Sequence, residues 1–158
     1  MVCICAREIH GNIGEKLRKI KVGYTAGAFD LFHIGHLNLL RNARQQVDRL
    51  IVGVSDDNLV QEYKKKPPTI PFEERIEIVR SIKFTDEAVP QSDLDKVLAW
   101  KALSFDVLFV GDDWKGHARW VNYEKQLGLV GVPIIYLPYS HATSSSILRN
   151  TLSKLSDD

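Results

Sequence analysis

Hydrophobic and polar positions follow two alternating patterns from residue 20 to residue 155. Short apolar runs are typical of buried strands, and they occur at 20–26, 49–55, 86–90, 106–111 and 133–137. Apolar residues three or four positions apart predict helices at 34–46, 72–82, 92–103, 120–128 and 145–155. We interpret the polar, lysine-rich stretch between the second strand and the helix at residue 72 as a loop.

The order of these elements predicts the fold class. Strands that alternate with helices indicate βαβ units, and therefore an α/β protein with a Rossmann-like, doubly wound, five-stranded parallel sheet in a single domain. We expect this domain to span residues 21–158, with residues 1–20 as an N-terminal extension. Such sheets bind ligands at the carboxyl ends of their strands, near the point where the strand order reverses.

Composition agrees with one domain and argues against two classes of partner. The 158 residues are 44% hydrophobic, and 21 basic against 20 acidic residues leave a net charge of +1. That balance gives no reason to expect a nucleic-acid or membrane partner. The longest nearly apolar run, "GLVGVPIIYLP", is about half as long as the ~20 residues that a membrane span needs. We expect a cytoplasmic protein, with Cys3 and Cys5 as reduced thiols.

The segments richest in reactive side chains follow predicted strands. "GAFDLFHIGH" (27–36) follows the first strand, "GDDWKG" (111–116) the fourth and "YSHATSSS" (139–146) the fifth. Because the carboxyl ends of parallel strands meet at one edge of a sheet, we expect these segments to form one site.

Two histidines in the first of these segments suggest an anion site. If a helix begins near Phe32, His33 and His36 lie one turn apart on one face, beside the positive end of the helix. Imidazoles there suit a phosphate, and Gly35 would let the ligand approach the backbone closely. Two ordinary histidines, or a zinc pair without a third ligand, are the alternatives. The neighbouring Asp30 and the glycines favour the anion site.

Basic and hydroxyl side chains extend the same interpretation. Lys64, Lys65 and Lys66 would form a solvated loop elsewhere, but at this edge they could neutralise a triphosphate. Arg75 fits either a phosphate contact or a salt bridge with a neighbouring glutamate. The run 143–146 supplies a helix cap and more hydroxyls than a cap needs, which suits a phosphate.

The "GDDWKG" segment forms either a tight turn or a contact to a base, a sugar or a metal. The chain contains neither G-x-x-x-x-G-K-[ST] nor G-x-G-x-x-G, which argues against a P-loop or the standard dinucleotide fingerprint.

"GAFDLFHIGH" resembles the H-x-G-H signature of the nucleotidyltransferase superfamily. "KKPPTIPFEERIEIVRSIKFTDEAVP" is similar to the corresponding block of the cytidylyltransferases that make CDP-alcohols, and "GDDWKG" resembles the form in glycerol-3-phosphate cytidylyltransferases. The resemblance runs from about residue 21 to residue 155. A class I aminoacyl-tRNA synthetase is excluded by length and by the lack of a K-M-S-K-S segment.

The residue patterns and the resemblance together identify candidate site residues. The catalytic candidates are His33, His36, Lys65 and Arg149. The candidates for binding nucleotide are Gly27, Ala28, Phe29, Asp30, Gly35, Asp112, Trp114, Thr143, Ser144, Ser145 and Ser146. The candidates for binding substrate phosphate are Lys64, Lys66, Arg75 and Lys115. The resemblance implies that the histidines stabilise charge on the transferring phosphoryl group and that Asp30 helps to organise the site, with a metal ion as one means. We expect Mg²⁺ on the triphosphate, with few dedicated protein ligands.

Two departures from the cytidylyltransferase pattern concern the substrates. Ala28 stands where that family usually has threonine, and "YSHATSSS" lacks the family's arginine and Gly-Ile pair. The run from Ser144 to Arg149 is more similar to the I-S-S-T-x-I-R helix start of adenylyltransferases, so Arg149 would take over the triphosphate contact.

The resemblance predicts a homodimeric enzyme that transfers CMP from CTP to a small alcohol phosphate, with glycerol 3-phosphate as the leading acceptor. Ethanolamine phosphate, choline phosphate and other polyol phosphates stay open. An adenylyltransferase that uses ATP, with FMN or a sugar phosphate as acceptor, is the first alternative. A non-catalytic nucleotide-binding regulator is the second.

Overall fold

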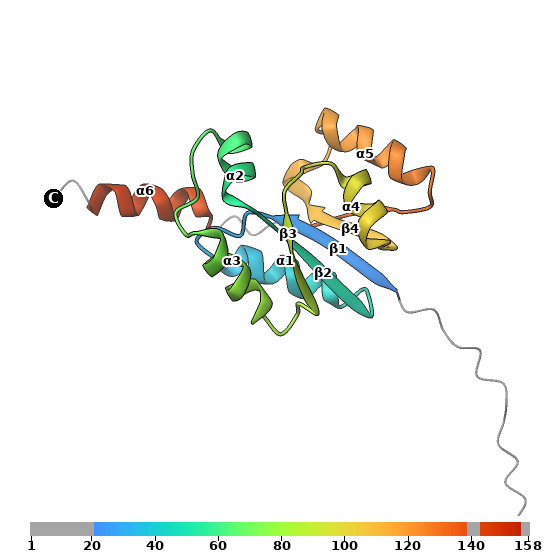
Figure 1. The fold of residues 1–158 in the computed structure, drawn as a ribbon, viewed down its shortest axis with the longest axis horizontal. Coiled ribbons are helices and arrows are strands. Elements are labelled where there is room, and N and C mark those ends of the chain that lie inside the picture. The colour runs from blue at the N-terminus through green and yellow to red at the C-terminus, as the bar shows by residue number, and fades with distance from the viewer. Residues whose placement is uncertain (1–20, 139–142, 156–158) are drawn as a thin grey trace, which may run out of the picture.

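A computed structural model describes residues 21–138 and 143–155 of the chain (Figure 1). The strands are β1 (Val22–Gly27), β2 (Arg49–Ser55), β3 (Glu87–Gln91), β4 (Val107–Gly111) and β5 (Ile134–Leu137). The α-helices are α1 (Ile34–Arg44), α2 (Asp57–Lys64), α3 (Phe72–Arg80), α4 (Lys96–Leu103), α5 (Ala118–Gly128) and α6 (Ser145–Leu155). A 3₁₀ turn, η1 (Asp112–Trp114), follows β4.

The five strands form one parallel sheet in the order β3-β2-β1-β4-β5. The order reverses between β1 and β4, because the chain first builds outward through β2 and β3 and then returns to the other side of β1. The predicted fold class, a Rossmann-like, doubly wound parallel sheet, is therefore confirmed.

Helices cover both faces of the sheet, and each face carries its own apolar cluster. Helices α1 and α3 pack on one cluster, which includes Leu40, Val79 and Phe109. Helices α4 and α5 pack on the other, which includes Leu108 and Trp120. Neighbouring residues of β4 thus enter opposite cores, as the two-residue period of a strand requires.

Two predictions about the elements differ most from the structure. The stretch that we interpreted as a loop contains helix α2, because Asp56 caps it by accepting a hydrogen bond from the Leu59 backbone N–H at 2.8 Å. The apolar side chains of Leu59 and Val60 are buried. Helix α4 begins four residues later than predicted, since Asp95 is the side chain that caps it.

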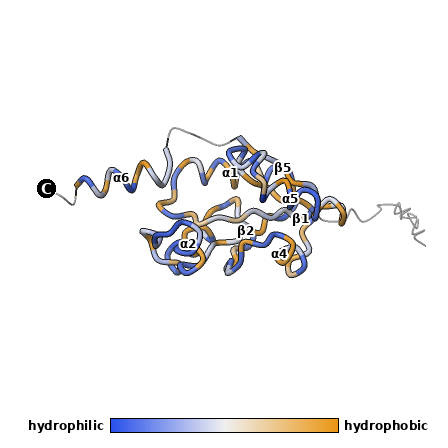
Figure 2. Tube along the Cα trace, turned by 90° about the horizontal axis from the view of Figure 1, so that it is seen from above, coloured by the Kyte–Doolittle hydropathy of each residue, from blue (hydrophilic) through white to orange (hydrophobic). Residues whose placement is uncertain are grey.

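The last helix differs from the others in its packing. Helix α6 extends away from the sheet in both views (Figures 1 and 2), and none of its residues is buried. Within the described residues, no helix combines the length and the apolar character that crossing a membrane requires.

Candidate active site

A cavity of about 300 Å³ opens at the carboxyl edge of the sheet. Ten predicted site residues line it: Gly27, Ala28, Phe29, Asp30, His36, Lys64, Trp114, Ser144, Ser145 and Ser146. Segments that are far apart in sequence therefore meet at one edge, as expected from their positions after strands.

The two histidines cap helix α1 reciprocally. His33 occupies the N-cap position, where its Nδ1 accepts the Gly35 backbone N–H at 3.0 Å. In return, Nδ1 of His36 accepts the His33 backbone N–H at 3.4 Å, and the two rings stack with centroids 4.0 Å apart. Helix α1 begins at Ile34 rather than near Phe32, so His33 precedes its first turn.

Burial keeps both rings neutral, and the cap decides which nitrogen of each ring carries the proton. Burial lowers the pKa of His33, and burial together with the nearby His33 lowers that of His36 to about 3. Both rings are therefore neutral near pH 7. Because Nδ1 accepts a hydrogen bond in each ring, the proton resides on Nε2. Nε2 of His33 is buried without a hydrogen-bond partner in the described structure, which leaves an N–H donor for a ligand.

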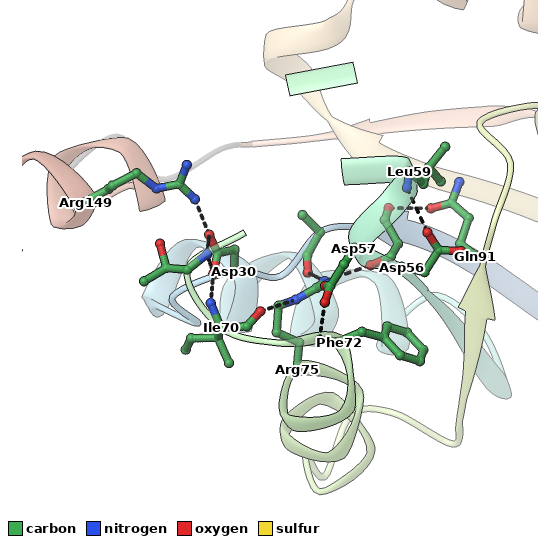
Figure 3. Close-up of polar contacts among 12 residues, drawn as sticks. Asp30, Asp56, Asp57, Leu59, Ile70, Phe72, Arg75, Gln91 and Arg149 are labelled. Atoms are coloured by element: carbon green, nitrogen blue, oxygen red, sulfur yellow. Dashed lines mark hydrogen bonds and ion pairs between the residues drawn. The ribbon is translucent and has the colours of Figure 1, made fainter. Parts of the chain in front are cut away.

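Asp30 connects three segments of the site (Figure 3). Its carboxylate accepts the backbone N–H groups of Thr69 and Ile70 at 2.9 and 3.0 Å, and it forms an ion pair with Arg149 of α6. Burial alone would raise the pKa of Asp30, but these hydrogen bonds and the guanidinium hold it below its ordinary value.

The loop that carries Asp30 has an unusual backbone. Phe29 and Leu31, on either side of Asp30, adopt φ angles of 50° and 49°, in the left-handed region that non-glycine residues seldom occupy. Such conformations persist where surrounding contacts hold them, and they are frequent at binding sites.

The prediction that Arg75 contacts substrate phosphate is not supported by its position. The side chain is fully buried, and its guanidinium donates to the carbonyls of Ile70 at 2.8 Å and Ser55 at 2.8 Å, and to that of Ala28. It also pairs with Asp57 at 2.6 Å (Figure 3). Arg75 therefore holds strand ends and loops together beneath the cavity.

The three lysines that we predicted to bind phosphate lie in different places. Lys64 lines the cavity, and desolvation lowers its pKa although Asp30 acts in the opposite direction. Lys65 ends helix α2 with a φ of 58° and borders a second, neighbouring hollow instead. Lys66 is exposed and lines neither.

The segment after β4 contributes a different carboxylate from the one predicted. Asp113 and Trp114 line the cavity, whereas Asp112 does not. Lys115 lies over the Tyr136 ring, with Nζ 5.9 Å from its centroid, and it lines no part of the cavity.

The serine run lies at the start of α6, next to the β1–α1 loop. Ser145 Oγ donates to the Asp30 carbonyl at 2.6 Å, and Ser144 Oγ accepts the Ile147 N–H at 3.3 Å. Thr143 stays outside the lining, as does Arg149, whose guanidinium is directed at Asp30.

Three polar residues that line the cavity were not predicted from the sequence. Gln91 ends β3, Lys96 begins helix α4, and Arg119 comes from α5. Lys96 is only 6% exposed, and burial lowers its pKa to about 8 although two aspartates oppose the shift. Asp93 and Asp95 partly offset the cost of burying this cation at the positive end of a helix, and a bound anion would offset it further. The available signal was the Ser/Asp cap before α4, which we read only as a helix start.

Among the described residues, no cluster of three or more His, Cys, Asp or Glu could hold a metal ion. The Asp30 carboxylate is already occupied by two N–H groups and a guanidinium.

A doubly wound parallel sheet with side chains suited to phosphate at its carboxyl edge is typical of α/β proteins that bind nucleotides there. The Cytidylyltransferase-like family model matches residues 24–151. The chain therefore belongs to this family, within the nucleotidyltransferase superfamily.

Relatives of two kinds are similar to the chain. The FAD synthase of Thermococcus kodakarensis is 32% identical over 141 residues, covering 85% of this chain and 93% of that protein. The glycerol-3-phosphate cytidylyltransferase of Bacillus spizizenii is 32% identical over 133 residues, covering 83% and 96%. A lipopolysaccharide core biosynthesis protein from Thermoplasma volcanium has the same fold, with a TM-score of 0.65 at 21% identity over 77% of this chain and 97% of that one.

Proposed function

We propose that the protein transfers a nucleotidyl group from a nucleoside triphosphate to a small phosphate monoester and releases pyrophosphate. The observation that carries this proposal is the reciprocal histidine cap at the start of α1. It holds two neutral, stacked imidazoles: the Nε2–H of His33 has no partner among the described residues, and His36 lines the cavity.

In the proposed reaction, a phosphate oxygen of the acceptor attacks the α-phosphorus in line. The bond from the α-phosphorus to the bridging oxygen breaks, and pyrophosphate leaves with the electron pair. A phosphate oxygen is already a good nucleophile, so the protein needs only to position both substrates and to stabilise the developing charge. Neutral N–H donors serve this purpose without a proton transfer.

The two substrates would occupy different halves of the cavity. The half of the cavity near the ends of β4 and β5 offers the Trp114 ring and the hydroxyls at the start of α6, which suit a nucleoside and its phosphates. The half near the ends of β2 and β3 offers Lys96, which suits the acceptor phosphate, whereas Lys64 lies closer to Asp30 and Arg149. In-line attack requires this opposition, since the acceptor and pyrophosphate lie on opposite sides of the α-phosphorus.

CTP with glycerol 3-phosphate is the leading pair, supported by "GDDWKG" and by the glycerol-3-phosphate cytidylyltransferase relatives. ATP with FMN is the second candidate. Its support is the serine run followed by Arg149, together with the FAD synthase relatives.

Mg²⁺ would accompany the triphosphate in either case, screening its charge. It would be held mainly by phosphate oxygens and water, because this ion keeps several waters and needs few protein ligands. A homodimer and a cytoplasmic location remain predictions.

Pyrophosphate release with Mg²⁺ tests the proposal, with CTP and ATP each crossed against glycerol 3-phosphate, phosphocholine, phosphoethanolamine and FMN. A signal from CTP with one alcohol phosphate supports the leading pair, and a signal from ATP with FMN supports the second. Nucleotide binding without pyrophosphate release from any pair would contradict both leading pairs and would favour an untested acceptor first and the regulator second.

A further inference from the structure

The ends of β2 and β3 contribute a pair of buried polar side chains that the proposed reaction does not use. Ser55 and Gln91 face each other in the parallel register, and Ser55 Oγ donates to Gln91 Oε1 at 3.0 Å. The two residues are 1% and 6% exposed, yet both line the cavity. Their mutual hydrogen bond offsets the cost of burying the pair, and it leaves lone pairs on both oxygens that a ligand can use.

Tyr63 of helix α2 extends this pair into a chain of three. Burial raises the pKa of the Tyr63 hydroxyl while the nearby Ser55 side chain acts to lower it, and Tyr63 lines the cavity beside the pair. The amide Nε2 of Gln91 donates to the Asp93 carbonyl at 2.8 Å. The Gln91 donors thus point partly away from the cavity, while the oxygens of the three side chains keep lone pairs that can accept hydrogen bonds.

The backbone holds this chain in position. The Ser55 carbonyl accepts a hydrogen bond from the Arg75 guanidinium at 2.8 Å, and the Gln91 carbonyl accepts the Asp56 N–H at 3.0 Å. A wall of acceptors that is rigid before binding loses little entropy when a ligand adds its own donors.

We propose that Ser55, Tyr63 and Gln91 select acceptors whose phosphate is attached to a polyol, by accepting hydrogen bonds from its hydroxyl groups. The inference rests on the proposed function, because it requires the acceptor phosphate to lie beside Lys96 in the same half of the cavity. Glycerol 3-phosphate and the ribityl phosphate end of FMN both carry hydroxyls next to the phosphate-bearing carbon.

The same wall disfavours two other acceptors. Phosphocholine has no hydrogen to donate to the three oxygens. Phosphoethanolamine has donors, but they belong to an ammonium group that would enter a half of the cavity already containing the buried Lys96. Repulsion between like charges in a partly desolvated site opposes its binding.

Binding of matched probes tests the inference independently of turnover. Calorimetric titration of the full chain, with Mg²⁺ and a non-hydrolysable CTP or ATP analogue, would compare glycerol 3-phosphate, ribitol 5-phosphate and FMN with propyl phosphate and phosphocholine. We expect at least one hydroxyl-bearing probe to bind about tenfold or more tightly than propyl phosphate, since unpaired buried acceptors are costly.

Two variants probe the wall directly. Tyr63→Phe and Gln91→Met should bring the ratio between the best polyol phosphate and propyl phosphate close to one, with affinity for the nucleotide analogue unchanged. Tyr136→Phe is the matched control, because the Tyr136 hydroxyl bonds to Glu124 and the residue does not line the cavity. It should keep the wild-type ratio.

Equal or tighter binding of propyl phosphate or phosphocholine by the wild-type protein would overturn the inference. So would binding of none of the polyol phosphates, or an unchanged ratio in both variants. Pyrophosphate release with some acceptor would still support the proposed function in those cases, so the two failures are distinguishable.

Discussion

The backbone of helix α1 fixes the tautomer of His33 and His36. Each Nδ1 satisfies a backbone N–H that the first turn of a helix leaves without a partner. Serine, threonine, aspartate or asparagine usually fills this position, and none of them would direct a ring N–H toward a ligand. One pair of side chains therefore caps the helix and supplies donors to the site.

Substitutions of His33 can separate these two tasks. His33→Ala and His33→Asn both remove the ring donor, and we expect each to lower the rate of pyrophosphate release by about 10²–10³-fold. Asparagine retains a helix cap, so His33→Asn should be more stable than His33→Ala by about 1 kcal/mol in urea unfolding. Near-full turnover of either variant would contradict the assigned role.

The lowered pKa of His36 makes stability depend on pH. An ordinary histidine has a pKa of 6.5, whereas burial lowers that of His36 to about 3. The unfolded chain therefore binds a proton between these values that the folded protein does not. The free energy of unfolding should fall as the pH drops below 6.5, by at most about 1.4 kcal/mol per pH unit from this residue. The lowered pKa of Asp30 acts in the same direction in stronger acid.

Urea unfolding at pH 7.5, 6 and 5 measures this dependence. His36→Gln should have a shallower slope than the wild-type protein, while His117→Gln, which changes an exposed histidine, should keep the wild-type slope. Identical slopes in all three proteins would show that His36 titrates normally.

At the scale of secondary-structure elements, Arg75 joins the ends of two strands to the start of a helix. Its guanidinium joins the end of β1, the end of β2 and the start of α2 through carbonyls and Asp57. Arg75→Met would leave those buried oxygens without donors, and we expect it to lower the free energy of unfolding by about 3 kcal/mol or more. Arg80→Met, which removes an exposed i,i+3 pair, should change it by about 0.5 kcal/mol or less. A small effect of Arg75→Met on the free energy of unfolding in urea would contradict this connecting role of Arg75.

Helix α6 is attached to the body mainly through polar contacts. No α6 residue is buried, and its described links to the β1–α1 loop are Ser145 with the Asp30 carbonyl and Arg149 with the Asp30 carboxylate. The serines that line the nucleotide half of the cavity therefore depend on these contacts for their position.

Loss of the ion pair should loosen α6 without unfolding the sheet. In Arg149→Met we expect faster amide hydrogen exchange along α6, unchanged exchange in β1 and β2, and a KM for the nucleotide raised about tenfold. Lys154→Met, near the exposed end of the same helix, should leave both quantities unchanged. Unaltered exchange in α6 would show that other contacts hold it.

At the scale of the whole molecule, the described fold and the family match lie within residues 21–155. We expect a variant that lacks residues 1–20 to keep the melting temperature and the pyrophosphate-release rate of the full chain. A loss of activity with the melting temperature retained would assign residues 1–20 to the reaction rather than to the fold.

Local patterns were sufficient for the five strands and for every described α-helix except α2, and the rule for carboxyl edges was sufficient to group the loops after the strands into one site. Apolar periodicity reports which face of an element is buried, and that information is contained in neighbouring residues. The histidine pair was recognisable for the same reason, because both side chains belong to a single helix start.

Other features depended on contacts between distant segments. The sequence was compatible with two roles for Arg75, a phosphate contact or a surface salt bridge with a neighbouring glutamate. The structure shows neither, because the side chain is buried and donates hydrogen bonds to three carbonyls from separate segments. Gln91 and Lys96 became site residues only because β3 is placed beside β2. Side-chain burial and pairing across strands are properties of three-dimensional packing, so no local pattern in the chain contains them.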